Sequence, residues 1–401
     1  MEIYNFNRKN NGITLIALVV SIIILLILAG ISIGMLSGEN GILKKASEAK
    51  EKTTLAQDKE NSTLGIYEDY INEYTSGLPK TEVTQPYLPD SSFKYIYGNL
   101  NSGLVIQDSN QNEYVWVEVP MSIYTNSNYN SQGTPTSAND FSKINSCLKS
   151  YTKDYASSEY NDTNPDYNKL YENMLTSIYT HGGFWIGRYE AGTSDNKSRT
   201  SYSETTITDR AVTKQNMYPY NYVTRKEAQL LSNRMSYKNS TSSLMFGIQW
   251  DLTLKFIEEK TVENSTETDK DAVRATIKNI LTQKGKEIGN YYDNLWNITN
   301  SQAKYLIFSE KIFNNCPKSK EAISAILLTT GSSENFSLMN IYDLAGNVYE
   351  WTLEFYSDEK PAVGRGGYYY GYSFDCPTNF RNSGDLTYYS SFFGFRICIW
   401  K

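Results

Sequence analysis

Histidine and cysteine, which serve much of the acid–base and metal chemistry of proteins, are scarce in this chain. Among its 401 residues there is one histidine, His181, which leaves little room for a histidine base or for a metal site built on several histidines. We expect His181 to be structural. The cysteines are Cys147, Cys316, Cys376 and Cys398. None of them has CxxC spacing, which argues against a zinc ribbon. Disulfides could form in an oxidising compartment, and the sequence leaves their pairing open.

Tyrosine is the unusual component of the composition. The chain has 34 Tyr against 15 Phe, and its formal net charge is -6. Nothing in this mildly acidic balance suggests nucleic-acid binding. A tyrosine brings contact area and a hydroxyl group at a low cost in side-chain entropy, so binding surfaces favour it. The composition therefore points to recognition.

Many tyrosines lie near the C-terminus, interleaved with Asn, Asp and Ser. We predict that this stretch forms a ligand-binding face. The candidate ligand-binding residues are Tyr368, Tyr369, Tyr370, Tyr372, Asp375, Asn379, Asn382, Asp385, Tyr388, Tyr389 and Ser390. Arg365, Arg381 and Arg396 are expected to be scaffold, pairing with carboxylates or carbonyls beneath that face. The alternative is a Tyr-rich surface without a binding role.

Three turn-rich blocks organise this end of the chain, at residues 340–351, 365–370 and 394–399. Gly346-Asn347 lies between apolar runs and predicts a tight turn. Gly366-Gly367 allows positive φ or a close approach of two backbones. The final run, residues 393–399, has strand character and should pair back into the body of the domain.

The three blocks resemble the C-terminal core of the formylglycine-generating enzyme (sulfatase-modifying factor) family, a variant of the C-type lectin fold. The matching residues are Tyr-Asp-Leu-Ala-Gly-Asn-Val-Tyr-Glu-Trp at 342–351, Arg-Gly-Gly at 365–367 and Gly-Phe-Arg at 394–396. The resemblance covers about residues 86–401, with a divergent first half. It implies an α+β fold, and we place the C-type lectin-like domain at residues 93–401. It implies less about activity, because one fold hosts many functions.

The resemblance also bears on copper. Enzymes of this family hold copper with two cysteines five residues apart, just after the Arg-Gly-Gly block. Placed without gaps, those positions are Gly371 and Cys376. A single thiolate is a poor Cu(I) site, since soft Cu(I) needs at least two such ligands. We therefore expect no copper and no oxidase activity.

A structural calcium ion is also implied by the resemblance. In the family, the turn of the first block wraps calcium with two side-chain and two backbone oxygens, which suits a hard cation. The corresponding residues are Asp343 and Glu350 for the side chains and Gly346 and Val348 for the carbonyls. The alternative is a tight turn with solvated acids.

The C-terminal stretch further resembles the variable proteins of diversity-generating retroelements. Those proteins end in the same lectin-type domain, and mutagenised codons leave Tyr, Asn, Asp, Ser and Gly scattered before a terminal Gly-Phe-Arg. The resemblance implies a diversified binding face. One sequence displays no variation, so an unvaried face remains the alternative.

The N-terminal part predicts a membrane anchor. Residues 13–36 contain no charged side chain over 24 positions, enough for a helix to span a bilayer of about 30 Å. Arg8 and Lys9 precede this segment and favour an orientation with the N-terminus inside. Residues 37–74 are rich in helix formers and predict a stalk helix. Residues 75–92, with several prolines, predict a linker.

The start of the apolar segment resembles a type IV prepilin leader. The family's peptidase cuts after a Gly that precedes the apolar helix and then methylates the new N-terminus. Residues 1–12 would be the leader, Gly12 the last residue removed and Ile13 the methylated one. Ala17 departs from the pattern, because most pilins carry Glu at the fifth mature position. The alternative is a plain signal anchor.

The body of the chain shows strands and helices in alternation. Residues 104–108 and 114–120 predict a hairpin, and helices are expected around 139–150 and 166–179. Thr224 and Glu227 form a capping-box pattern that predicts a helix running to about Met235. A second helix is expected over 249–259. Residues 260–300 are predicted to be a charged helical insertion.

Together these features predict a ligand-binding protein, an adhesin or receptor, held in the cell membrane by residues 13–36 with its C-terminal domain outside the cell. Its partner would be an extracellular protein or a glycan, and it could ride on a pilus-like filament. Two alternatives stay open. One is a minor pilin or pseudopilin with a structural role, and the other is a formylglycine-type oxidase.

Overall fold

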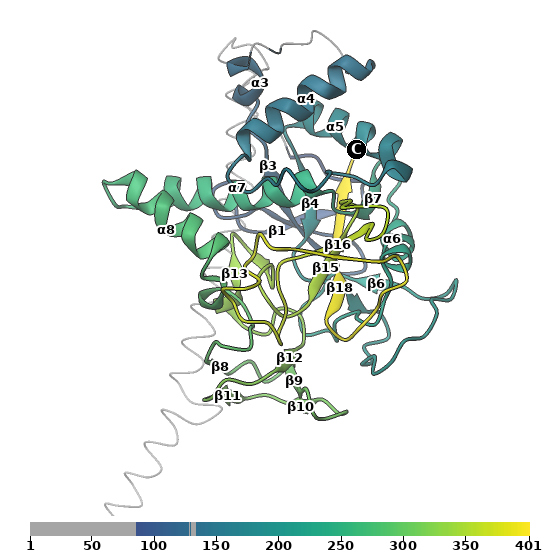
Figure 1. Ribbon diagram of the computed structural model, residues 1–401, viewed down its shortest axis with the longest axis vertical. Helices are drawn as coiled ribbons and strands as arrows, with labels where there is room; N and C mark the ends of the chain where they lie inside the picture. Colours follow the sequence, from purple (N-terminus) through teal and green to yellow (C-terminus); the bar gives the residue numbers. More distant parts are fainter. Residues whose placement is uncertain (1–85, 128, 130–133) are drawn as a thin grey trace, which may run out of the picture. The chain divides into compact units, whose positions relative to one another are not determined.

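The computed structural model describes residues 86–127, 129 and 134–401 (Figure 1). The predicted leader, membrane segment, stalk and most of the linker lie outside these residues. Within the described ranges, no helix has both the length and the apolar character that crossing a bilayer demands.

A six-stranded antiparallel sheet forms the centre of the described body. Its strand order is β1-β2-β3-β4-β19-β7. The strands are β1 (Lys94–Tyr97), β2 (Val105–Gln107), β3 (Glu113–Glu118), β4 (Gly183–Gly187), β7 (Thr241–Leu244) and β19 (Ile397–Trp400). The predicted hairpin is confirmed as β2 and β3, in which Val105 is opposite Val115. The last strand of the chain, β19, lies between β4 and β7, so the C-terminus is part of the core sheet.

Helices flank this sheet, and Figure 1 shows α4 and α5 at one end of the body and the α7–α8 pair projecting from one side. The α-helices are α3 (Ser122–Asn126), α4 (Ala138–Tyr151), α5 (Asn168–His181), α6 (Arg225–Asn233), α7 (Gly247–Asn264) and α8 (Lys270–Thr282). The 3-10 helices are η1 (Pro165–Tyr167), η2 (Gly285–Glu287) and η3 (Glu334–Phe336). The helices expected near 139–150, 166–179, 224–235 and 249–259 are therefore confirmed.

The capping box at the start of α6 is present as predicted. The Glu227 backbone N–H donates to Thr224 Oγ1 at 3.3 Å, and the Thr224 N–H donates to Glu227 Oε2 at 3.0 Å. The Glu227 carboxylate also accepts from the Tyr202 hydroxyl at 3.2 Å and from the Thr205 N–H at 3.0 Å. The cap therefore also holds the loop before it.

The prediction for residues 260–300 is only partly right. The helix α8 accounts for 270–282, but the chain then leaves the helical path and reaches strand β8 (Trp296–Ile298). Close packing explains the difference. A Cβ atom at Gly289 would lie 2.1 Å from the Ala345 carbonyl oxygen, so this segment runs directly against the 343–350 turn, and Tyr291 is fully buried.

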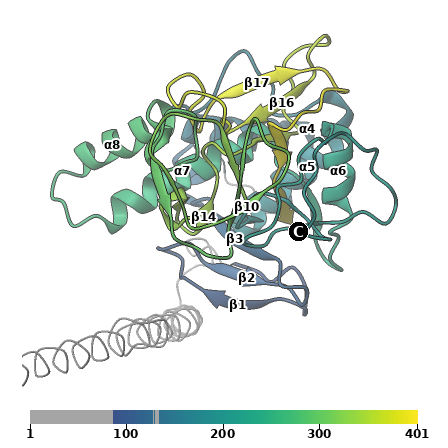
Figure 2. The same ribbon diagram turned by 90° about the horizontal axis from the view of Figure 1, so that it is seen from below.

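A second sheet of four strands carries the C-terminal tract, which we define as residues 366–395. Its order is β17-β16-β15-β18, and β15 and β18 are parallel. Its strands are β15 (Tyr349–Thr352), β16 (Ala362–Arg365), β17 (Arg381–Gly384) and β18 (Phe393–Phe395). Figure 2 shows β16 and β17 on one side of the body, opposite β1 and β2.

Smaller sheets complete the body, in the orders β10-β9-β12, β11-β8, β13-β14 and β5-β6. Their remaining strands are β5 (Gly192–Thr193), β6 (Ala211–Val212), β9 (Lys304–Ile307), β10 (Asn314–Asn315), β11 (Lys318–Lys320), β12 (Ile326–Leu328), β13 (Ser337–Leu338) and β14 (Ile341–Tyr342).

The final apolar run is divided between the two sheets. The strand expected over 393–399 breaks at Arg396, so that β18 belongs to the second sheet and β19 to the first. The break has a physical cause: the Arg396 side chain is buried and donates to the carbonyls of Gly187 and Tyr342 at 2.9 and 2.8 Å. Through its ion pair with Glu350 of β15 and its bond to Gly187 of β4, Arg396 joins the two sheets.

The core is rich in aromatic rings. Trp116 and Trp185 meet edge to face with their centroids 5.0 Å apart. Tyr87 belongs to the same cluster, with its ring 5.5 Å from Trp116 and 4.7 Å from His181. Tyr87 thus packs into the body, although it falls in the residues expected as linker. Burial and the nearby Lys401 charge lower the pKa of His181, in keeping with a structural role.

Candidate functional site

A charge-balanced ion network lies beneath the C-terminal tract. Arg365 binds Asp251 Oδ1 at 2.6 Å and Glu354 Oε2 at 2.9 Å. Arg381 binds the same two carboxylates, with Nη2 2.8 Å from Asp251 Oδ2 and Nε 2.6 Å from Glu354 Oε1. We call these four residues the balanced network. All four side chains are at most 8% exposed.

The balanced network fixes the floor of the tract. It ties α7, which carries Asp251, to strands β16 and β17, which carry the two arginines. Burial alone would raise the pKa of Glu354, but the charges of Arg365 and Arg381 outweigh burial and lower it. At Asp251, by contrast, burial outweighs the same two charges and raises the pKa to about 6. Two guanidinium groups thus pair with two desolvated carboxylates, as a buried ion pair requires. The prediction that Arg365 and Arg381 are scaffold is confirmed.

A second buried network is not balanced. Arg396 Nη2 and Nε lie 2.5 and 2.9 Å from the two Glu350 carboxylate oxygens. Asp343 accepts from the Gly331 N–H at 2.6 Å. Glu190 accepts from the Val348 N–H at 3.1 Å and from the Asn347 amide at 2.6 Å. We call Glu190, Asp343, Glu350 and Arg396 the acidic network. Arg396 is scaffold, as predicted.

The acidic network holds three carboxylates against one guanidinium, and the pKa values follow from this. Burial, with the Glu350 charge adding to it, raises the pKa of Asp343 to about 7, although the Gly331 N–H and Arg396 oppose the change. Burial and then the charges of Asp343 and Glu350 raise the pKa of Glu190 well above its usual range. Protons are therefore retained here at a pH where ordinary carboxylates have lost them.

The acidic network includes two of the predicted calcium ligands. The turn does bring Asp343, Gly346, Val348 and Glu350 together, with positive φ at Asp343 and Gly346. The Glu350 carboxylate is occupied by Arg396, and Asp343 is held by Gly331. In the part of the chain that the structure describes, no group of three or more His, Cys, Asp or Glu is arranged to hold a metal. The two carboxylates do not fit a calcium site in this arrangement, and unfolding with and without calcium tests whether the ion displaces their partners.

The two positions that the family uses for copper are neighbours in space. A Cβ atom at Gly371 would lie 2.3 Å from Cys376 Sγ, as the gap-free placement of the motif requires. Cys376 is buried, its thiol donates to the Tyr372 carbonyl at 3.1 Å, and burial raises its pKa to about 11. All four cysteines are free thiols. The residues present do not fit copper, because the second soft ligand is missing.

Most of the predicted ligand-binding residues reach the surface. The four most exposed tyrosines are Tyr370 (44%), Tyr372 (41%), Tyr388 (42%) and Tyr389 (44%). Asp375 and Asp385 are also exposed, and the half-buried residues are Tyr368, Asn379, Asn382 and Ser390.

Tyr369 is the exception, and its prediction as a ligand contact is wrong. Its side chain is 2% exposed and packs with its ring centroid 5.5 Å from that of Phe392. Its backbone N–H donates to the Asn347 carbonyl at 3.0 Å. This bond ties the start of the tract to the 343–350 turn and directs the Tyr369 ring inward.

Exposed aromatic residues that the sequence did not single out join the predicted ones in two patches. The Phe308 patch consists of Phe308, Tyr370, Tyr372 and Phe374, which are 48%, 44%, 41% and 66% exposed. The Tyr389 patch consists of Tyr202, Leu386, Tyr388 and Tyr389. The Tyr202 and Tyr389 rings stack with centroids 4.2 Å apart.

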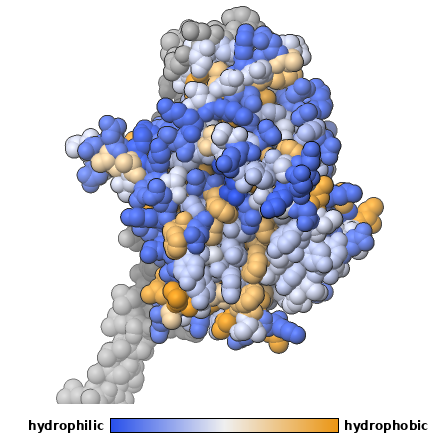
Figure 3. Space-filling view, viewed as in Figure 1, coloured by the Kyte–Doolittle hydropathy of each residue, from blue (hydrophilic) through white to orange (hydrophobic). Residues whose placement is uncertain are grey.

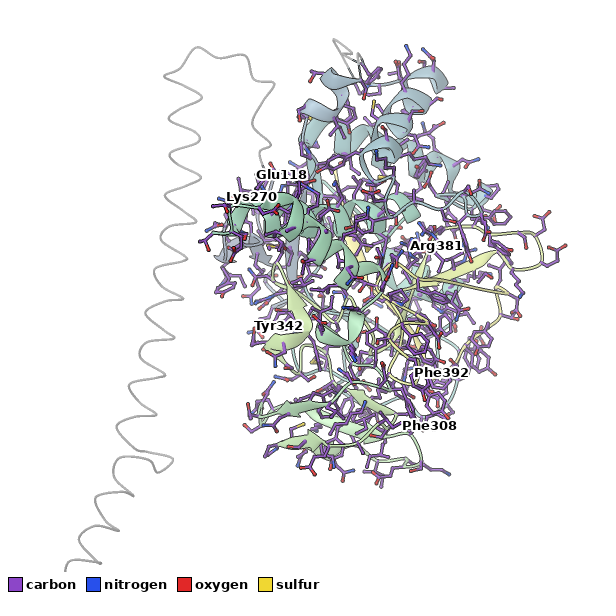
Figure 4. The ribbon with its side chains drawn as sticks, turned by 60° about the vertical axis from the view of Figure 1, so that its left-hand side comes forward. Glu118, Lys270, Phe308, Tyr342, Arg381 and Phe392 are labelled. Atoms are coloured by element: carbon purple, nitrogen blue, oxygen red, sulfur yellow. The ribbon has the colours of Figure 1, made fainter. Side chains whose placement is uncertain are left out.

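Phe308 and Tyr202 lie far from the tract in sequence, and no periodicity connects them to it. Phe308 follows directly after β9, and Figure 4 shows it beside Phe392. Phe374 lies inside the tract, and its apolar character made it look like scaffold. A signal was present there, because Phe374 stands between the polar residues Ser373 and Asp375 and not in an apolar run.

The backbone of the tract is braced between these side chains. The Asp293 carboxylate accepts from the Ser373 N–H at 2.8 Å and from its hydroxyl at 2.9 Å. The Tyr292 N–H donates to the Gly371 carbonyl at 2.9 Å. Gly367 has φ +81°, and a Cβ there would lie 2.3 Å from the Cys376 carbonyl oxygen. Glycine is therefore required at this position.

Two solved structures are similar at low identity. Treponema denticola variable protein 1 is 14% identical, over 55% of this chain and 85% of its own, with a TM-score of 0.29. CarF is 12% identical, over 55% of this chain and 87% of its own, with a TM-score of 0.31. Similarity at this level says nothing about what this chain binds.

Curated proteins give no match. The family model of the sulfatase-modifying factor enzyme 1-like domain matches residues 152–401, which is more than half of the chain. The matched region contains the three C-terminal blocks, both buried networks and the whole tract. The chain therefore belongs to the family of the sulfatase-modifying factor enzyme 1-like domain, and its described body has the α+β, C-type lectin-like fold of that family.

Proposed function

We propose that this protein binds a ligand through the exposed rings of its C-terminal tract. The observation that supports this best is the pairing of four tyrosines, each more than 40% exposed, with a backbone fixed from beneath by the balanced network. Large rings on a rigid frame lose little entropy when a partner binds, so their contact area contributes to affinity. The buried lone thiol of Cys376 gives no comparable support for oxidase chemistry.

The proposal includes display outside the cell on the segment at residues 13–36, processed as a prepilin. Mass spectrometry of the protein from its native cells tests this. We expect a mature N-terminus at Ile13, methylated, and cleavage of the C-terminal domain by protease added to intact cells. An unprocessed Met1 with protected C-terminal domain would contradict both display and the pilin-like anchor.

The proposal also includes diversification, which means that the sequence of the tract varies between cells. It is tested by sequencing this locus in many cells and by searching its neighbourhood for a reverse transcriptase with a template copy of residues 365–396. We expect substitutions at the exposed tyrosines and none at Arg365, Arg381 or Arg396. An invariant tract without a template would exclude diversification and leave an unvaried binding face.

Binding itself is tested with the full-length protein in detergent micelles, applied to glycan arrays and to arrays of purified extracellular proteins. The informative variant is Tyr388→Ala with Tyr389→Ala, and the matched control is Tyr356→Ala, which is 38% exposed and outside both patches. We expect the double variant to weaken binding by about tenfold or more, as for hot-spot aromatic residues. The control should bind normally.

The structural alternative, a minor pilin, makes a different prediction. If the chain only supports a filament, the double variant should assemble normally and no array ligand should depend on the tract. A ligand that binds the wild type and the double variant equally would contradict the proposed face. Loss of filaments in a strain that lacks this protein, without any loss of ligand binding, would favour the structural role.

A further inference from the structure

We infer that the Phe308 patch docks a protein partner that presents apolar side chains together with lysine or arginine. This inference rests on the proposed function, because two members of the patch belong to the tyrosines of the tract. It goes further in two respects. It adds a contact residue from a different part of the chain, and it assigns the partner to one chemical class.

The patch is one continuous set of rings drawn from separate segments. The Phe308 ring centroid lies 4.8 Å from that of Tyr370 and 5.7 Å from that of Phe392, and the Phe308 and Phe392 rings are stacked. Tyr292 extends the set, with its centroid 5.7 Å from Tyr370 and 5.2 Å from Tyr372. Figure 4 shows Phe308 and Phe392 on the same side of the body.

The rings are held in place before any partner arrives. The Phe308 backbone N–H donates to the Ala325 carbonyl at 3.0 Å, and the neighbouring Ile307 pairs with Ile326 of β12. On the other side, the Asp293 carboxylate holds Ser373 between Tyr372 and Phe374. Exposed apolar groups on such a rigid base are costly in water, and contiguous groups of this kind mark interaction sites.

The apolar character continues beyond the rings. Ile312, in the same β9–β10 connection as Phe308, is 76% exposed. Figure 3 shows hydrophobic residues gathered toward the β8–β12 end of this face, with hydrophilic residues around them. A large apolar centre with a polar rim is typical of protein interfaces.

Charge near the patch favours a basic partner. The charged residues of the tract are Asp375, Arg381 and Asp385. Arg381 is used within the balanced network, and Asp385 adjoins the Tyr389 patch, so the exposed carboxylate beside the Phe308 patch is that of Asp375, which follows Phe374. Glu310 offsets Lys311 in the segment that follows Phe308. The whole chain carries a formal charge of -6.

The same features argue against a sugar. Carbohydrate hydroxyls need polar groups that converge on them, but Phe308, Phe374 and Ile312 have none, and the Asp293 carboxylate already binds Ser373. Aliphatic and aromatic side chains of a protein would fill the centre of the patch. Guanidinium or ammonium groups would lie over the tyrosine faces and beside Asp375, where both cation–π contact and charge attraction favour them.

The test uses the full-length protein in detergent micelles and a phage-displayed random library of dodecapeptides as the probe. Peptides retained by the wild type are depleted against Phe308→Ala, so that only peptides that need Phe308 remain. We expect these to combine Lys or Arg with Leu, Ile or aromatic residues. As synthetic peptides, they should bind Phe308→Ala about tenfold more weakly, and Asp375→Asn several-fold more weakly. Their affinity should fall with added salt.

Two further variants keep this test interpretable. Phe308→Tyr retains the ring and should bind nearly as the wild type does, which separates loss of contact from loss of folding. Ile207→Ala removes an 81% exposed apolar side chain outside the patch and should have no effect. Retained peptides without basic residues, or peptides that bind Phe308→Ala as tightly as the wild type, would overturn the inference. A glycan that needs Phe308 would overturn the assignment to a protein.

Failure of this inference is distinguishable from failure of the proposed function. If a ligand is lost in the Tyr388→Ala, Tyr389→Ala variant but not in Phe308→Ala, the tract binds and the Phe308 patch does not. If no ligand depends on either patch, both proposals fail.

Discussion

The C-terminal tract combines two layers whose composition is the reverse of the usual one. The inner layer lies beneath the tract and is ionic, with Arg365, Arg381, Asp251 and Glu354 all buried, whereas the outer layer consists of the exposed tyrosine and phenylalanine rings of the tract. Soluble domains normally bury rings and expose charges. On the proposed function, stability and recognition are separated here: the buried ions would fix the backbone, and the outer rings would contribute little to folding and be free to bind a partner.

The strongest test of this comparison is Arg365→Leu. The substitution leaves Asp251 and Glu354 buried with one guanidinium between them, and an unpaired buried carboxylate costs about 3–5 kcal/mol. We expect a loss of that order in the free energy of unfolding, measured by urea denaturation. The control is Lys169→Leu, since the Lys169–Glu172 pair at 3.2 Å is exposed and should be dispensable. An Arg365→Leu protein as stable as the wild type would mean that the inner layer does not hold the fold.

The balanced network has two carboxylates and two guanidinium groups, whereas the acidic network has three carboxylates and one guanidinium group. Asp343→Asn tests how this excess of carboxylates changes stability with pH. Because the folded state raises the pKa of Asp343 from 3.8 to about 7, folding takes up a proton between those values. The stability from this group is complete below about pH 4 and is lost as the pH rises toward 7. We expect the asparagine variant to lack this loss and to be more stable than the wild type at pH 8, by up to about 4 kcal/mol.

The measurement for Asp343→Asn is urea unfolding across pH 4 to 8, once with calcium and once with a chelator. We expect the wild-type curve to be the same in both, because Arg396 occupies Glu350. A wild type stabilised by calcium at pH 8 would show that the turn opens to take the ion, and would restore the predicted calcium site. If the free energy of unfolding changed with pH equally in the variant and the wild type, this would contradict the protonation of Asp343 in the folded state.

A smaller effect is expected from Gly371→Ala, which acts at the boundary between the layers. The new methyl group would lie 2.3 Å from Cys376 Sγ and 2.6 Å from Tyr368 Cε1, so both side chains must move. Overpacking of this kind costs about 1–3 kcal/mol. Thermal unfolding measures the loss, and increased labelling of the Cys376 thiol would show the displacement. Adding Cys376→Ala to Gly371→Ala removes the sulfur and should therefore restore part of the lost stability.

The sequence predicts the inner layer far better than the outer one. The hairpin at β2 and β3 and the capping box at Thr224 depend on local patterns, and both are confirmed, as is the scaffold role of the arginines. The third block is confirmed only in part, because its run breaks at Arg396 into two strands. The family that the three blocks predicted is also confirmed, since the family model matches residues 152–401.

What the sequence could not predict depends on contacts between distant segments. Tyr369 is indistinguishable from Tyr370 by type, and contacts with distant residues, among them the bond from its N–H to Asn347, accompany its burial. Phe308 joins Tyr370 across more than sixty residues, through the pairing of β9 with β12. The break at Arg396 follows from buried carbonyls that belong to two other strands. None of these has a periodic signal.

The smallest effect on stability is expected where the effect on binding is largest. Tyr389→Ala removes the stack with Tyr202, and such ring pairs contribute about 0.5–1.5 kcal/mol beyond the area they bury, with exposed pairs at the lower end. A double-mutant cycle over Tyr202 and Tyr389, measured by urea unfolding, should therefore give a coupling below about 1 kcal/mol. If Tyr389→Ala instead destabilised the protein as much as Arg365→Leu, the outer rings would be part of the fold. A tract whose rings hold the fold could not vary them, so this result would also remove the physical basis for diversification.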